Sequence, residues 1–171
     1  MNKHTIHVFY SGEDKLLYAT VPAVLRQLQL LQKIWTKCPG ADGIALDLHD
    51  TAEESFELTP ELVAAMASGR DTIVILITPQ VMLGKGMLDS EAHSALKANL
   101  VASTNILLCV YCEQVVCAQE LSQALGGLGW IYSAQTGRWL SQDKSANDAA
   151  ADAAKTVRDV LERKLSNRLG A

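Results

Sequence analysis

Segments of strand length alternate with segments of helical period along the chain, and this alternation constrains the fold more than any other feature. The strongest strand signal is 72–77, where every residue is apolar or β-branched, as in a strand covered by helices on both faces. Further strands are predicted at 5–10, 43–48 and 105–111. For a chain of 171 residues we therefore expect one α/β domain, 1–171, with a flavodoxin-like open parallel sheet of order 2-1-3-4-5 and helices on both faces.

Helix signals fill the intervals between these strands. From 14 to 35 apolar residues recur with the spacing of one helix face, and Pro22 indicates a kink or a restart near Val21. Thr59 can cap a second helix, which would end at Gly69. The remaining segments are predicted as helices at 88–100 and 119–125, a hairpin at 130–140, and a closing helix that follows a capping box formed by Ser145 and Asp148.

The composition excludes several classes of function. Fifteen Lys and Arg residues against 19 Asp and Glu residues give a net charge of −4, so the chain lacks the basic surface of a nucleic-acid-binding protein. No apolar run approaches the roughly 20 residues that cross a bilayer, and we expect a cytoplasmic protein without a membrane partner. The four cysteines are expected to be reduced and buried, the histidines to be ordinary packed or surface residues, and no metal site is predicted.

The predicted fold locates a ligand site. In such sheets ligands bind at the carboxyl ends of the strands, where the strand order reverses between the first and third strands. These ends carry Tyr10-Ser11-Gly12 and Thr78-Pro79-Gln80, with Asp47 expected at the end of the second strand. The P-loop, the dinucleotide-binding G-x-G-x-x-G, the G-x-S-x-G elbow and the H-E-x-x-H motif are absent from the sequence, which excludes ordinary NTPases, dehydrogenases, hydrolases with a nucleophile elbow and zinc proteases.

Several carboxylates accompany these strand ends. We expect Asp14, Asp50 and Asp89 to be solvated residues of helix starts and loops. Glu91 differs because it lies in a helical stretch of small and apolar residues, where a single carboxylate could stay near the cleft.

Three segments resemble the Toll/interleukin-receptor (TIR) domain family. The segment Phe9-Tyr10-Ser11-Gly12-Glu13-Asp14-Lys15 is similar to the first TIR box. The segment Leu46-Asp47-Leu48-His49-Asp50, followed by Glu54-Ser55-Phe56, is similar to the second. Ile75-Leu76-Ile77-Thr78-Pro79, followed by Met87-Leu88-Asp89-Ser90-Glu91, resembles the third stretch of the family. The match extends in order and spacing over roughly residues 5–112, which is more specific than any single motif.

The resemblance to bacterial TIR-like proteins implies an NAD glycohydrolase that cleaves the nicotinamide glycosidic bond. The product would be ADP-ribose or its cyclic form, a signal in bacterial defence or virulence, and NAD would be the substrate with no separate cofactor. The family also implies self-association through TIR–TIR contacts. The family's catalytic glutamate falls on Glu91, and the residues expected to bind NAD or a related nucleotide are Tyr10, Ser11, Gly12, Asp47, Phe56, Thr78 and Lys85.

Two other functions remain open on the sequence. A TIR-like domain can act as a non-catalytic module for protein interaction and signalling, because a fold does not fix a function. The stretch Asp89-Ser90-Glu91 also resembles nucleoside deoxyribosyltransferases, which have a related fold and a nucleophilic glutamate on the helix after the third strand.

Overall fold

The computed structural model describes residues 4–34, 43–57, 59–62, 64, 71–83, 106–113, 115 and 145–169. Several sequence predictions lie outside these residues: the helices at 88–100 and 119–125, the hairpin at 130–140, the fifth strand, the solvated Asp89, and the candidate residues Lys85 and Glu91.

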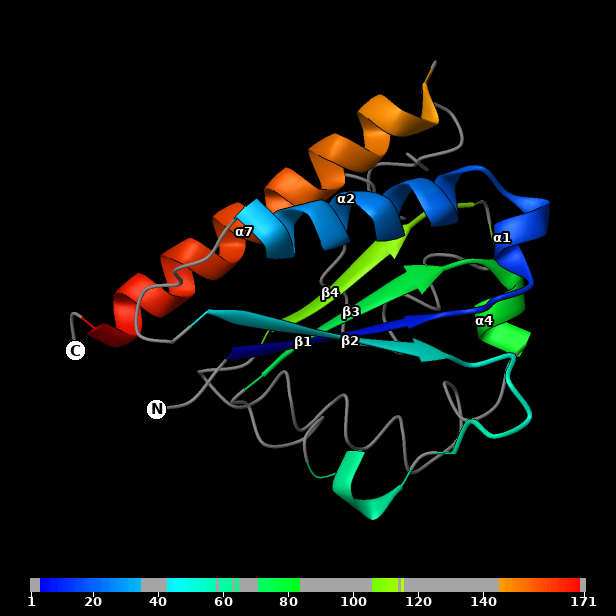
Figure 1. Ribbon diagram of the computed structural model, residues 1–171, viewed down its shortest axis with the longest axis horizontal. Coiled ribbons are helices and arrows are strands. Elements are labelled where there is room, and N and C mark those ends of the chain that lie inside the picture. Colours follow the sequence, from blue (N-terminus) through cyan, green and yellow to red (C-terminus); the bar gives the residue numbers. More distant parts are fainter. Residues whose placement is uncertain are drawn as a thin grey trace.

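Four parallel strands form the sheet. They are β1 (His4–Tyr10), β2 (Ile44–Asp50), β3 (Thr72–Ile77) and β4 (Ile106–Tyr111), in the order β2-β1-β3-β4 (Figure 1). This confirms the predicted α/β class and the order of the first four strands. All six residues of β3 are buried, in agreement with its continuously apolar sequence and its central place in the sheet.

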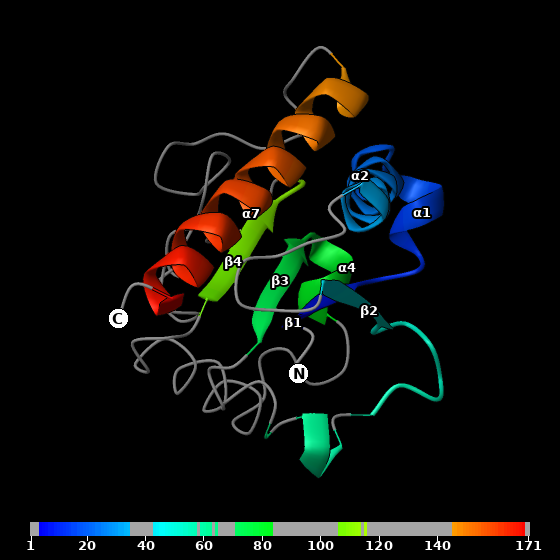
Figure 2. The same ribbon diagram turned by 60° about the vertical axis from the view of Figure 1, so that its left-hand side comes forward.

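Two helices lie side by side over one face of the sheet (Figures 1 and 2). These are α2 (Thr20–Ile34) and α7 (Ala146–Leu169). The predicted restart near Pro22 is confirmed, because a short α1 (Asp14–Leu17) ends before α2 begins. Pro22 therefore lies in the first turn of α2, where its missing N–H removes no intrahelical hydrogen bond.

The core between these helices and the sheet is mostly aliphatic, with Tyr10 among its members. In α7 the buried positions are mostly alanines, whose small side chains let α7 pack closely against α2 and the sheet. The Ser145 cap of the predicted capping box is confirmed, since the Asp148 N–H donates to Ser145 Oγ at 3.4 Å. The core members contributed by the two helices are Val21, Ala23, Val24, Leu25, Leu28, Leu31, Ala149, Ala150, Ala153, Ala154, Val157, Val160 and Leu161.

The opposite side of the sheet carries a helical turn at 60–62 (Figure 1). Thr59 caps this turn as predicted, because its Oγ1 accepts the Leu62 N–H at 3.2 Å. A further short helix that the sequence did not predict, α4 (Pro79–Leu83), follows β3 directly. Helical structure therefore lies on both sides of the sheet and at the carboxyl end of its central strand.

Candidate functional site

The turn after β1 is held against the end of β2. The Gly12 N–H donates to Asp50 Oδ1 at 2.6 Å, and the Ala52 N–H donates to the same oxygen at 3.0 Å. The Tyr10 carbonyl accepts two hydrogen bonds from Thr51, from its N–H at 2.8 Å and from its hydroxyl at 3.2 Å. The Asp50 carboxylate is thus half-buried and fixes the turn, so the expectation that it is a solvated loop residue is wrong.

Gly12 is required by this close approach. A methyl group on its Cα would overlap the Asp50 carboxylate, and rotating that carboxylate away would break both of its hydrogen bonds. We expect Gly12→Ala to lower the free energy of unfolding by about 1–2 kcal/mol, measured by urea denaturation. The double variant Gly12→Ala/Asp50→Ala should lose less than the sum of the two single variants; additive losses would show that the overlap is relieved elsewhere.

A buried carboxylate joins the ends of β1 and β3. Thr78 Oγ1 donates to Asp14 Oδ2 at 2.6 Å, and both side chains are fully buried. The same Thr78 oxygen accepts the Val81 N–H at 3.2 Å, so Thr78 also caps α4. The expectation of a solvated Asp14 is therefore wrong, because its side chain is buried. Its hydrogen-bond partner lies 64 residues away in the chain, so no local sequence pattern reveals the burial.

Asp14 retains unused hydrogen-bonding capacity. Within the described part of the chain, its Oδ1 has no hydrogen-bond partner. Burial raises the pKa of the Asp14 carboxyl, the Thr78 hydrogen bond opposes that rise, and the nearby Glu113 and Glu13 carboxylates add to it. A buried carboxylate with a raised pKa at the carboxyl ends of strands is typical of a functional site.

The end of β4 lies at the same corner of the sheet, by which we mean the carboxyl ends of the strands around the Asp14–Thr78 pair. The Ile77 carbonyl accepts the N–H groups of Cys112 and Glu113, at 3.1 and 3.3 Å. Glu113 Oε1 then accepts the hydroxyl of Thr20 at 3.0 Å, at the start of α2. Cys112 is fully buried, and burial raises the pKa of its thiol, so it is an inert packed cysteine as predicted.

The predicted site residues separate into two groups. Ser11, Gly12 and Thr78 lie together at the β1 and β3 ends, as the strand order requires. Tyr10 is part of the core under α2, with Lys15 Nζ 5.1 Å from its ring centroid. Asp47 is not at a strand end, because β2 continues to Asp50.

Asp47 and Phe56 belong to the other side of the sheet. The Phe56 ring packs edge-on against Phe9, with centroids 6.5 Å apart. Asp47 is the register partner of His7, with 3.9 Å between Asp47 Oδ2 and His7 Nδ1. Both residues therefore pack against the face of the sheet that carries His7 and Phe9.

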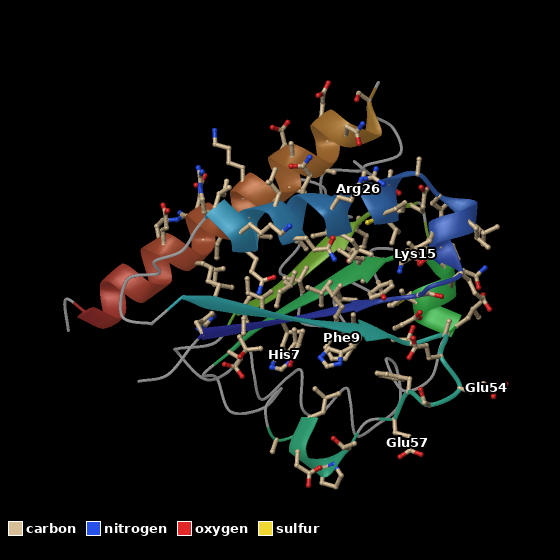
Figure 3. The ribbon with its side chains drawn as sticks, viewed as in Figure 1. His7, Phe9, Lys15, Arg26, Glu54 and Glu57 are labelled. Atoms are coloured by element: carbon tan, nitrogen blue, oxygen red, sulfur yellow. The ribbon has the colours of Figure 1, made fainter. Side chains whose placement is uncertain are left out.

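Two histidines that the sequence pattern leaves unrelated lie together on this face. His7 Nδ1 is 3.1 Å from His49 Nε2, and the His49 ring stacks on Phe9 at 4.8 Å between centroids. Figure 3 shows His7 and Phe9 on the side of the sheet away from α2 and α7. Burial lowers the pKa of His49, the neighbouring His7 lowers it further, and Asp47 opposes this, which favours a neutral imidazole.

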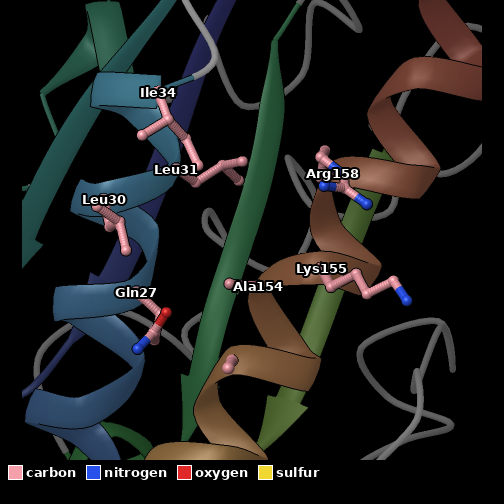
Figure 4. A pocket seen from close by; sticks show the side chains of 8 residues that line it. Gln27, Leu30, Leu31, Ile34, Ala154, Lys155 and Arg158 are labelled. Atoms are coloured by element: carbon pink, nitrogen blue, oxygen red, sulfur yellow. The ribbon is translucent and has the colours of Figure 1, made fainter.

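A groove of about 210 Å³ lies between α2 and α7 (Figure 4). Apolar side chains of α2, Leu30 and Ile34 among them, line one wall, and Lys155 and Arg158 of α7 line the other. It lies toward the C-terminal end of α2, whereas α1 and α4, which begin at Asp14 and directly after Thr78, lie at the other end of the sheet (Figure 1). This groove therefore plays no part in the strand-end site.

No helix among the described residues is long and apolar enough to cross a membrane. Comparison with known proteins found no matching family model, no similar curated protein and no similar solved structure.

Proposed function

We propose that this chain is a TIR-like NAD glycohydrolase that releases nicotinamide from NAD at the carboxyl ends of β1 and β3. The observation that carries the proposal is the Asp14–Thr78 pair at this point. In the order β2-β1-β3-β4, the strand order reverses between β1 and β3. Ligands of open parallel sheets bind at the carboxyl ends of the two strands that flank such a reversal. The residues similar to the TIR boxes, Ser11-Gly12 and Thr78, come from these two strand ends.

The electrostatics of the corner suit the cationic end of the substrate. Asp14, Glu113 and Asp50 surround the turn after β1, and no lysine or arginine forms an ion pair with Asp14 in the described part of the chain. A positively charged nicotinamide ring is attracted by such a site, whereas a pyrophosphate is not. The phosphates would therefore be bound by backbone N–H groups or by Lys85.

The chemistry needs only one carboxylate at the reacting carbon. The bond between C1′ of the ribose and the ring nitrogen breaks, its electron pair goes to that nitrogen, and nicotinamide leaves as a neutral base without a general acid. Glu91 would stabilise the positive charge that develops on the ribose. Water then adds to C1′ and releases a proton to solvent, or a nucleophile of the adenosine part adds and gives the cyclic product.

The proposal predicts that the purified chain releases nicotinamide from NAD. Release is followed by chromatography over a series of chain concentrations, and the rate per chain should rise with concentration because TIR–TIR contacts complete the site. The control is the same incubation with 2′-deoxynucleosides. Base release from deoxynucleosides but not from NAD would replace the proposal with a deoxyribosyltransferase, and no release from either would leave the interaction module as the function.

A further inference from the structure

A cluster of nitrogen and oxygen ligands lies on the face of the sheet opposite α2 and α7. The parallel register aligns His7 with Asp47 and Phe9 with His49, so residues two apart on neighbouring strands share this face. One ligand atom from each of His7, Asp47 and His49 lies within 4.8 Å of the other two. Adjacent strands thus present two imidazoles and one carboxylate to a common point.

A second carboxylate, that of Asp71, contacts the ring nitrogen of His7 that faces away from this cluster. Asp71 Oδ2 is 3.2 Å from His7 Nε2, and Asp71 is buried. A carboxylate at this distance requires the proton on Nε2, which leaves the lone pair of Nδ1 directed at His49 Nε2, 3.1 Å away. A carboxylate bound to the outer nitrogen of a histidine is the usual support of a metal-binding imidazole.

We propose that His7 Nδ1, His49 Nε2 and Asp47 Oδ2 bind a zinc ion. Ligands at about 2.0–2.1 Å from a tetrahedral zinc lie roughly 3.3 Å apart, close to the 3.1 Å between the two nitrogens. Asp47 Oδ2 is 3.9 Å from His7 Nδ1, and its side chain is 62% exposed, so a small rotation brings it into range. Zinc replaces the hydrogen bond between the rings, and His49 shifts its proton from Nε2 to Nδ1.

The donor set selects the class of metal. Magnesium and calcium prefer all-oxygen ligands, whereas imidazole suits zinc and its neighbours among the transition metals. Three protein ligands leave a fourth position open, on the exposed Asp47 side of β2, which is the outermost strand among the described residues on that side of the sheet. Stacking on Phe9 holds the His49 ring, and the ion would link β2 to β1. This site is separate from the Asp14–Thr78 corner, and it does not depend on NAD cleavage.

Titration of the untagged chain with zinc sulfate in a calorimeter tests the proposal. We expect one zinc per chain, and His49→Ala or Asp47→Ala should lower the affinity by at least about 10-fold; Asp71→Asn should lower it about 10- to 100-fold although it removes no ligand. Asp47→Ala changes an exposed side chain, so its loss cannot be attributed to unfolding. The matched control is His4→Gln, since His4 bonds Thr72 from β1 and contributes no ligand.

Cobalt substitution identifies the donor atoms. Cobalt bound at this site should give visible d–d absorption without a thiolate-to-cobalt charge-transfer band, and Asp47→Ala should change the spectrum. Absence of stoichiometric binding, equal affinity in wild type and His49→Ala, or a thiolate band would each overturn the proposal; the first outcome would leave Asp71, His7 and His49 as a structural hydrogen-bond chain.

Discussion

Thr78→Val is expected to lower the free energy of unfolding by about 3 kcal/mol at neutral pH. Valine has nearly the same shape, so the core loses no volume, but the hydroxyl that donates to Asp14 and accepts from Val81 is lost. A fully buried carboxylate whose Oδ1 already lacks a partner in the described part of the chain would then lose its short Thr78 hydrogen bond as well. A poorly paired buried charge costs more than an unpaired neutral group. Urea denaturation of wild type and variant measures the loss.

Two comparisons make this result specific. Thr78→Ser keeps the hydroxyl and should retain most of the stability. Thr156→Val changes a hydroxyl that bonds only the Asp152 carbonyl within α7, and it should change the stability by less than about 0.5 kcal/mol. A Thr78→Val variant as stable as wild type would contradict a stabilising role for the hydroxyl, because valine keeps the methyl group of threonine and lacks only its hydroxyl.

Asp14→Asn, in contrast to Thr78→Val, should raise the free energy of unfolding. The amide still accepts the Thr78 hydroxyl, but it carries no charge, and its nitrogen replaces the oxygen that has no described partner. Because the folded-state pKa of Asp14 is raised, the native wild-type chain binds its proton more tightly than the unfolded chain. Wild type therefore loses stability as the pH rises from the unfolded-state pKa to the raised folded-state pKa, and this loss persists at higher pH.

The difference in free energy of unfolding between Asp14→Asn and wild type should consequently grow over that pH interval. Above it, the difference should stay constant at about 1 kcal/mol. Asp152→Asn, an exposed position on α7, is the control and should show no such gain. If Asp14→Asn were less stable than wild type at pH 7, the cost of burying the Asp14 charge would be offset by its surroundings, and this prediction would be wrong. If Asp14→Asn were more stable but cleaved NAD more slowly, Asp14 would be a residue retained for function at the expense of stability.

Local signals account for most of the described fold. The continuously apolar β3 (Thr72–Ile77) and the cap at Ser145 are features of a few neighbouring residues, so they are visible in sequence. The short α4 is not, because Pro79 to Leu83 is too brief to show a helical period, and its cap depends on the Thr78 side chain. The sequence pattern ends β2 two residues early because the strand's polar ending, His49-Asp50, resembles a loop.

The candidate sites show where sequence reasoning fails. Ser11, Gly12 and Thr78 are expected together because strand order alone brings them together. Burial of Asp14 depends on a hydrogen bond across 64 positions, which no local pattern encodes. The pairing of His7 with His49 needs the strand register. The two-residue spacing of Asp47 and His49 is the available sequence signal, and it becomes informative only once β1 and β2 are aligned.

Glu91→Gln is expected to slow nicotinamide release about 100- to 1,000-fold. Glutamine keeps the size and the hydrogen-bonding oxygen of glutamate, so it can still bind a ribose hydroxyl, but it lacks the negative charge that stabilises the positively charged transition state. NAD affinity, measured by equilibrium dialysis, should therefore change little, whereas the turnover rate falls.

Glu61→Gln is the matched control, because Glu61 is exposed and has no place in the proposed site. It should cleave NAD at the wild-type rate. If Glu91→Gln kept more than about a tenth of the wild-type rate, charge stabilisation by Glu91 would be excluded, and the buried Asp14 would become the carboxylate to test next. If both variants lost activity equally, the assay would be reporting folding or self-association. A loss confined to Glu91→Gln, with unchanged NAD binding, distinguishes a catalytic carboxylate from a residue that only shapes the pocket, because only the catalytic role requires the charge.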